Sequence, residues 1–179
     1  MHALRHMFAA LIAAMMVVAA VPVRADVTEN DVKAAFLPRF ARYVIWPPSA
    51  RPDGTDPFVL CVIGNDPFGD GLDSAARGQS VDGRRIVVRH LDSPSGAGQC
   101  HIAFVAGSHS QSVGQMLAAL RGKPILTVTD SAEGDARGMI HFAVVSGRVR
   151  FFIDNAEALS RGIDISSRLL ALAVAVKQR

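Results

Sequence analysis

The sequence predicts an α/β fold: a mainly parallel sheet flanked by helices, with a C-terminal antiparallel hairpin and a C-terminal helix. Three observations support this prediction. Short runs at residues 58–63 and 101–106, apolar at every position but His101, are typical of strands buried on both faces of a sheet. Segments with helical spacing alternate with such runs, which favours parallel strands joined by helical crossovers. Near the end of the chain, two strand-like runs flank Ser146-Gly147, a pair typical of a tight hairpin turn.

The first element is a predicted helix. Thr28, with Asp31 three residues later, is typical of a helix start, and apolar residues then recur at helical spacing as far as Trp46. Pro38 lies within this stretch and should kink the helix, because proline lacks an amide hydrogen and crowds the preceding turn. Further prolines end the helix, and residues 47–56 are predicted to form a polar linker.

The central part of the chain alternates between strands and helices. Strands are expected at residues 58–63, 84–89, 101–106 and 125–129. The second of these lies nearer a sheet edge, because its apolar residues alternate with polar ones. Helices are expected at residues 67–76 and 112–120, and Gly122 ends the latter. Between the second and third strands, residues 92–99 are rich in Ser, Gly and Pro and predict a loop.

The last part of the chain departs from this alternation. Residues 139–145 and 148–153 are predicted to pair as the antiparallel hairpin. Residues 163–176 are apolar nearly throughout and predict the C-terminal helix, with Asp164 or Ser166 as its cap. A helix that is apolar nearly all round is either buried in the domain or part of a partner surface.

Residues 1–25 have the features of a cleaved secretory signal. A charged start precedes an uncharged run at residues 7–21, and small residues at 23–25 predict cleavage before Asp26. The alternative is an uncleaved anchor helix, but about 15 apolar residues fall short of the roughly 20 that span a bilayer. The prediction is therefore a signal peptide followed by one domain, residues 26–179, outside the cytoplasm.

The positive charge of the chain does not indicate nucleic-acid binding. The formal net charge is +3, but Arg5 and Arg24 lie in the predicted signal, so 17 of the 19 Lys and Arg remain against 16 Asp and Glu, a net charge of +1. The sequence also lacks a basic run with interleaved aromatic residues. Nucleic acid is therefore not expected as a partner.

The motifs that could carry chemistry do not form a recognisable site. Residues 64–71 are rich in glycine and follow a strand, but they lack the Lys and Ser/Thr pair of a phosphate-binding loop, so they predict a structural turn. Ser108-His109-Ser110 lacks the strand-turn-helix serine motif of hydrolases and predicts a surface loop. The histidines of the predicted domain lack metal-ligand spacing: His90, His101, His109 and His141. The sequence therefore predicts no catalytic residue, cofactor or metal.

Cys61 and Cys100 are the two cysteines of the chain. Export would place them where disulfides persist, and a bridge closing this loop would stabilise the fold by roughly 4 kcal/mol. Two buried free thiols fit the residues equally well, because spacing does not reveal the geometry that a disulfide requires.

A row of charged residues lies on and just after the second strand of the predicted hairpin. Arg148, Arg150 and Asp154 alternate along one face of its second strand, and Arg161 and Arg168 lie nearby in the sequence. Such a row could bind an anionic ligand or an acidic partner. It also fits the solvated face of an edge hairpin.

A series of short segments occurs in a characteristic order along nearly all of the predicted domain. The segments are residues 32–37 (VKAAFL), 46–47 (WP), 58–64 (FVLCVIG), 66–69 (DPFG), 83–84 (GR), 100–102 (CHI), 126–130 (LTVTD), 138–142 (GMIHF), 149–151 (VRF) and 165–173 (ISSRLLALA). Taken together they resemble the YfiR/HmsC-like periplasmic proteins, which carry a DUF4154-type domain. Pro38 and Arg137 depart from the family pattern, which commonly has a polar or aromatic residue and a glycine at these positions.

The resemblance implies a non-enzymatic periplasmic regulator with an α/β domain that is often dimeric. Members of the family repress an inner-membrane diguanylate cyclase by binding its periplasmic sensor domain, and an outer-membrane lipoprotein can sequester them. For this chain the resemblance implies reduced cyclic-di-GMP signalling and biofilm formation, and a disulfide between Cys61 and Cys100. We expect the partner to contact the first helix and the basic residues near the C-terminus: Arg148, Arg150, Arg161 and Arg168.

A second hypothesis is a small-molecule-binding module that feeds a sensor kinase or a cyclase. It predicts a pocket at the carboxyl ends of the parallel strands, near Gly64 and Gly107, because open α/β sheets bind ligands there.

Overall fold

The computed structural model describes residues 27–178. The predicted signal peptide, residues 1–25, and the predicted cleavage site before Asp26 lie outside the described residues. Within residues 27–178, no helix has both the length and the apolar character needed to cross a membrane.

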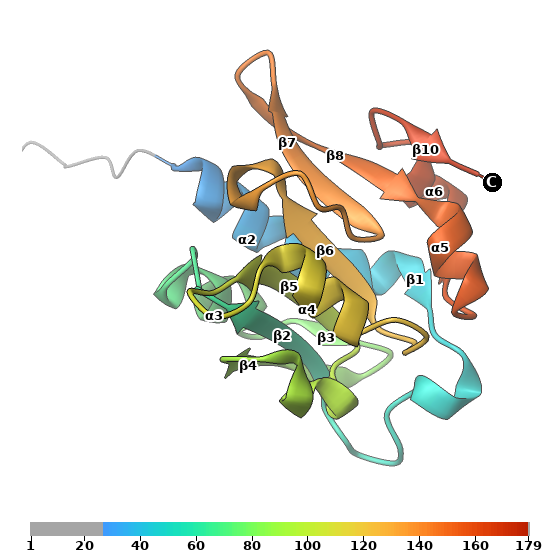
Figure 1. Ribbon diagram of the computed structural model, residues 1–179. Helices are drawn as coiled ribbons and strands as arrows, with labels where there is room; N and C mark the ends of the chain where they lie inside the picture. Colours follow the sequence, from blue (N-terminus) through green and yellow to red (C-terminus); the bar gives the residue numbers. More distant parts are fainter. Residues whose placement is uncertain (1–26, 179) are drawn as a thin grey trace, which may run out of the picture.

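An eight-stranded sheet forms the centre of the molecule (Figure 1). Its strand order is β10-β8-β7-β6-β5-β2-β4-β3. The strands are β2 (Phe58–Gly64), β3 (Ser80–Val81), β4 (Arg84–Leu91), β5 (Ile102–Gly107), β6 (Leu126–Asp130), β7 (Ile140–Val145), β8 (Arg148–Asp154) and β10 (Val176–Lys177). The five strands from β4 to β7 in this order run parallel, and β8 pairs antiparallel with β7. The predicted mainly parallel sheet with a late antiparallel hairpin is confirmed.

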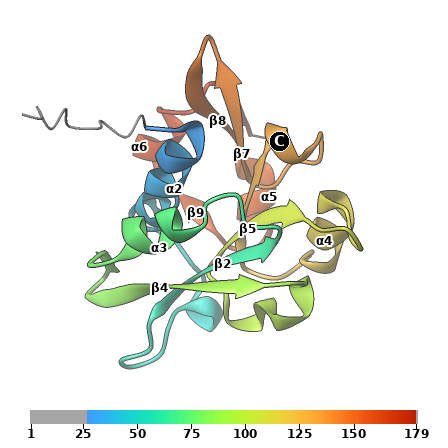
Figure 2. The same cartoon turned by 90° about the vertical axis from the view of Figure 1, so that its left-hand side faces the viewer.

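Helices cover both faces of the sheet. Figure 2 shows α2 (Glu29–Phe40) and α3 (Asp70–Ala76) on one side and α4 (Val113–Ala119) on the other. The larger apolar cluster lies on the α2 side, and a smaller one lies beneath α4 and the 3-10 turn η3 (Pro94–Gln99). Because both faces are covered, the central strands are apolar along their length, as the sequence predicts.

Aromatic side chains hold α2 against the sheet. Phe36 and Phe40 of α2 meet Phe142 of β7 and Phe151 of β8, with ring centroids 5.3–6.2 Å apart across the four helix–sheet pairs. Packing of this kind contributes beyond the buried area alone. The start of α2 is as predicted, since the Thr28 side chain accepts the amide of Asp31 in a capping box.

A buried ion pair also fastens α2 to the sheet. Lys33 and Asp130, the last residue of β6, are 2% and 4% exposed, and Lys33 Nζ lies 2.5 Å from Asp130 Oδ2. Asp130 Oδ1 accepts the amide of Ala132, which caps the 3-10 turn η4 (Ser131–Glu133). Each charge is therefore compensated by the other in an environment that would penalise either one alone.

The predicted extent of the first helix is wrong. The helix ends at Phe40, and a 3-10 turn η1 (Ala41–Tyr43) leads into the short strand β1 (Val44–Ile45). β1 pairs antiparallel with β9 (Asp164–Ile165), far along the chain. The apolar residues after Phe40 satisfied the helical spacing, but long-range strand pairing determines their conformation.

The predicted C-terminal helix at residues 163–176 is also replaced by shorter elements. After α5 (Asn155–Ser160), the chain forms β9, the single-turn helix α6 (Ser167–Leu170) and the edge strand β10. Ser166 does cap α6, as expected, by accepting the amide of Arg168. Backbone pairing with β1 at one end and with β8 at the other draws the segment out of a continuous helix.

Candidate functional site

The β7–β8 hairpin extends beyond the body of the molecule in both views (Figures 1 and 2). Ser146 and Gly147 form its turn with φ values of 52° and 70°, the left-handed backbone that two-residue hairpin turns need. Val144 and Val145, just before the turn, are 41% and 39% exposed. The tip thus carries apolar surface that the domain itself does not cover.

The predicted row of arginines is partly assembled by the hairpin. Arg148 and Arg150 alternate along β8 on the face opposite the α2-side cluster, and both are exposed. Arg150 lies across from Ala143, and Arg148 lies across from Val145. Among the described residues, no carboxylate forms an ion pair with either arginine. Val145 shares the face of the two arginines, whereas Val144 pairs with Val149 and lies on the opposite face of the hairpin. The exposed end of the hairpin, formed by Val144, Val145, Arg148 and Arg150, is referred to below as the hairpin tip.

The other two predicted partner residues are placed differently. Arg161 follows α5, and its side chain is 6% exposed because it binds Glu157 and the carbonyls of Leu120 and Lys123. Arg168 is exposed on α6, whose Leu169 packs into the cluster on the α2 side of the sheet. The four arginines therefore do not form one surface, and Arg161 serves to join α5 to the loop after α4.

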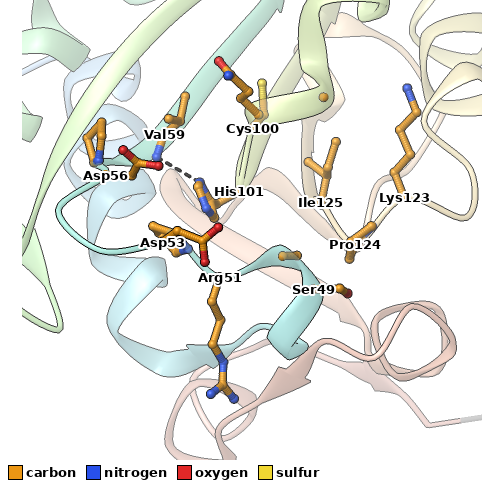
Figure 3. Close-up of a pocket in the computed structure, with 15 residues that line it drawn as sticks. Ser49, Arg51, Asp53, Asp56, Val59, Cys100, His101, Lys123, Pro124 and Ile125 are labelled. Carbon is orange, nitrogen blue, oxygen red and sulfur yellow. Dashed lines mark hydrogen bonds between the residues drawn. The ribbon is translucent and has the colours of Figure 1, made fainter.

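A second candidate site is a cleft of about 570 Å³ at the amino ends of the parallel strands. Figure 3 shows it between the linker before β2, the start of β5 and the segment before β6. Its main lining residues are Arg51, Asp53, Asp56, Val59, Cys100, His101, Lys123 and Ile125. This group of residues is referred to below as the amino-end cleft.

His101 is fixed in the amino-end cleft by several hydrogen bonds. Its Nδ1 accepts the amide of Val59 at 3.0 Å, and its own amide donates to the carbonyl of Val59 at 2.9 Å. The carbonyl of His101 accepts the indole N–H of Trp46 and the amide of Leu126. The ring stacks on Phe58 with centroids 4.6 Å apart. These contacts join three strands and the Trp46 segment at one residue.

The protonation of His101 follows from this environment. Burial lowers the pKa of His101 below its usual 6.5, so the ring is neutral near pH 7. Because Nδ1 accepts a hydrogen bond from Val59, the remaining proton sits on Nε2. The residue is 9% exposed and lines the cleft, and no described residue accepts a hydrogen bond from Nε2.

The disulfide expected from the family resemblance is present. Cys61 of β2 is bonded to Cys100, which follows η3, and their Cα atoms are 5.8 Å apart. Both residues are buried in the cluster on the α4 side, and Cys100 also lines the amino-end cleft. The bridge thus joins the η3 segment to the centre of the sheet beside the cleft.

Among residues 27–178, none of the five main clefts is lined by Gly64 or Gly107, where the ligand-binding hypothesis predicts a pocket. These glycines lie against each other: a Cβ on Gly64 would sit 2.0 Å from the Gly107 carbonyl oxygen, and Asn65 donates its amide to that same oxygen. Backbone therefore fills the predicted space. The glycine-rich residues 64–71 form a structural turn into α3, and Ser108-His109-Ser110 forms a loop with an exposed histidine.

The family model for YfiR/HmsC-like proteins matches residues 30–174, nearly the whole of the described chain. The chain belongs to the YfiR/HmsC-like family. This membership confirms the resemblance predicted from the ordered segments. It also covers the hairpin tip and the amino-end cleft, so both candidate sites lie within the domain that defines the family.

Two features of this YfiR/HmsC-like domain are not predicted from the sequence: the buried partner of Lys33 and the position of His101 in the amino-end cleft. Lys33 is the one charged residue on a buried helix face, a signal that could have predicted an acidic partner such as Asp130. His101 comes directly before the apolar strand β5, and this pattern does not distinguish a residue of a cleft wall from a residue of the core. The proximity of Asp53 and Asp56 to it had no sequence signal, because the linker before β2 has no periodic pattern.

Proposed function

We propose that this protein is a non-enzymatic periplasmic regulator that represses an inner-membrane diguanylate cyclase by binding the cyclase's periplasmic sensor domain. Membership of the YfiR/HmsC-like family carries this proposal. Repression would lower cyclic-di-GMP and thereby limit biofilm formation.

The hairpin tip is the surface that best supports a protein partner. It combines the unpaired cations of Arg148 and Arg150 with the exposed Val145 on the same face, and Val144 is exposed on the other face of the hairpin. Interfaces that bury arginine next to apolar side chains are typical of protein recognition, and a basic patch favours an acidic partner. The other expected contacts, Arg168 on α6 and the exposed side of α2, lie on the α2 side of the sheet, whereas Arg148 and Arg150 face the opposite side. A partner that contacts all of them would have to wrap around the hairpin. Arg161 is left out of the proposed interface because its hydrogen bonds are made within the domain.

Repression requires a difference in affinity between two states of the cyclase. A protein that bound the active and inactive conformations equally would shift neither. The regulator must therefore bind the inactive sensor domain more tightly, and release of the regulator restores cyclase activity. We propose that an outer-membrane lipoprotein provides this release by sequestering the protein, and that the regulator acts as a homodimer.

Co-purification together with a genetic measurement tests the proposal. The tagged protein would be recovered from periplasm and detergent-solubilised inner membrane, and cyclic-di-GMP would be measured in a deletion strain. We expect a cyclase with a periplasmic domain to co-purify and the nucleotide concentration to rise on deletion. If no cyclase is recovered and the nucleotide concentration is unchanged, the proposed function is wrong.

Charge reversal localises the contact. The variant R148E/R150E should fail to recover the cyclase and fail to complement the deletion, because both cations of the hairpin tip become anions. The matched control R77E/R85E makes the same change in net charge at exposed arginines on α3's end and β4. Equal behaviour of the two variants would remove the hairpin tip as the interface.

A further inference from the structure

We propose that the amino-end cleft binds a small organic ammonium compound that also carries a hydrogen-bond acceptor and an apolar body. This binding site is additional to the proposed regulatory surface and does not depend on it. The cleft lies at the amino ends of β2, β5 and β6, whereas the hairpin tip belongs to β7 and β8.

His101 supplies the first recognition group. Its imidazole is more than nine-tenths buried, its Nδ1 is occupied by the amide of Val59, and its Nε2–H borders the cleft without a partner among residues 27–178. This donor reaches the solvent of the cleft, so an acceptor on a ligand would replace water there, in surroundings where a hydrogen bond is stronger than in bulk water. The rigid stacking on Phe58 holds the donor in a fixed direction, so little ordering is needed on binding.

Asp53 and Asp56 supply the second recognition group. Both carboxylates line the cleft, and within the described part of the chain neither accepts a hydrogen bond nor forms an ion pair. In Figure 3 they lie on either side of the His101 imidazole, while the guanidinium of Arg51 points away from the cleft. Arg51 is held there by donating from Nε to the carbonyl of Trp46. The charge facing the cleft near His101 is therefore negative.

The remaining wall is apolar. Val59, Ile125, the prolines of the rim and Cys100 form a surface against which a hydrocarbon group can pack. The volume of about 570 Å³ falls in the range typical of small-molecule sites. An ammonium at the carboxylates of Asp53 and Asp56, an acceptor at His101 Nε2 and an alkyl group on this wall would satisfy the three parts of the cleft together.

Other ligand classes fit less well. The described residues contain no group of three His, Cys, Asp or Glu side chains arranged to hold a metal ion. A simple anion would meet the unpaired carboxylates of Asp53 and Asp56, and like charges at this range repel. Lys123 reaches the rim, and its charge would favour a ligand whose acceptor is itself partly negative.

Three matched probes test the proposal on the purified protein. Leucinamide carries an ammonium, a carbonyl and an isobutyl group; 3-methylbutylamine lacks the carboxamide; 4-methylpentanamide lacks the ammonium. Binding is measured by calorimetric titration and by the NMR signals of the His101 ring. We expect leucinamide to bind about tenfold more tightly than 3-methylbutylamine, to perturb the His101 ring, and to bind more tightly still than the uncharged amide.

Substitution at the rim separates specific binding from general charge effects. D53N/D56N should weaken leucinamide binding at least about tenfold, and it should fold normally because both side chains are exposed and make no hydrogen bonds. The control D92N/D135N removes two exposed carboxylates that do not line the cleft and should bind as the wild type does. No binding by the wild type, or equal affinity in D53N/D56N, overturns the proposal. Neither result depends on the cyclase, so it is distinct from failure of the proposed function.

Discussion

The two faces of the sheet are held together in different ways. On the α2 side, large side chains from distant parts of the chain interlock, and the buried Lys33–Asp130 ion pair joins helix to sheet. The α4 side has a smaller apolar cluster, which a disulfide and hydrogen bonds reinforce. There the loop before β7 donates amides of Gly138 and Met139 to the hydroxyls of Thr129 and Thr127.

The two faces of this small parallel sheet are thus covered in two different ways. Where a full helix is available, buried aromatic side chains stabilise its contact with the sheet, since each buried ring removes a large apolar area from water. Where only short segments cover the sheet, cross-links and hydrogen bonds must hold them in place. The faces should therefore respond to different perturbations.

The largest effect is expected from breaking the ion pair on the α2 side. Lys33→Met removes the cation and leaves the Asp130 carboxylate buried without compensation, which should cost about 3–5 kcal/mol of unfolding free energy. The double variant K33M/D130N should recover part of that loss, because Asn is neutral and can still accept the amide of Ala132. Chemical denaturation measures both.

The exposed pair Lys177–Asp154 provides the control for this prediction. Lys177→Met removes a cation that is largely in solvent, so its effect should be much smaller than that of Lys33→Met. A similar cost for Lys33→Met and Lys177→Met would show that the buried pair is not what fastens α2 to the sheet.

The next effect is expected from opening the disulfide on the α4 side. The C61A/C100A variant should lose about 2–4 kcal/mol of unfolding free energy, because the bridge limits the unfolded chain and joins η3 to the sheet. Hydrogen exchange should rise first in residues 94–107, while α2 keeps its protection. If amide exchange rises equally on both faces of the sheet, the two faces are not stabilised independently.

A smaller effect is expected from acid, and it arises on the α4 side and at the amino ends. Burial lowers the pKa of both His101 and His141 from the usual 6.5, so below that pH the unfolded chain binds protons that the folded chain does not. Unfolding free energy should therefore be constant above about pH 7 and fall as the pH drops through 6.5 toward the folded-state pKa values.

Denaturation between pH 7.5 and pH 5.5 measures this slope, and His141→Gln tests its origin. Glutamine does not titrate and can keep a hydrogen bond to Thr129, so the slope should become shallower. An unchanged slope would assign the acid sensitivity to other groups.

The sequence predicts the α/β class, most strands and the hairpin because these depend on local pattern. The run from Phe58 to Ile63 is apolar at every position, and Ser146-Gly147 suits a turn with positive φ. The residues after Phe40 and the segment 163–176 were mistaken for helix, because pairing between β1 and β9 is a contact across more than 100 residues that no local pattern encodes.

The candidate sites likewise divide into residues that a local sequence pattern groups and residues that only long-range contacts bring together. Arg148 and Arg150 alternate in sequence and share a face, so their grouping could be predicted. Arg161 could not be told from them, since its burial depends on the carbonyls of Leu120 and Lys123. The amino-end cleft combines a linker, a strand start and a loop, and such a site becomes visible only when the fold brings them together.

The smallest predicted effect concerns Arg137, at the edge of the α4 side. Its guanidinium lies 5.5 Å from the centroid of the Phe152 ring, an exposed cation–π contact worth about 0.5–1 kcal/mol. After burial, the charge of Arg137 is the next cause that lowers the pKa of His141. Arg137→Gln should therefore reduce stability slightly at pH 7.5 and also make the acid slope shallower. A double-mutant cycle with Phe152→Leu measures the contact itself. If the cycle gives no coupling energy but the acid slope still changes, Arg137 acts on this face only through its charge. If neither the coupling energy nor the slope changes, Arg137 does not contribute to the stability of the α4 side.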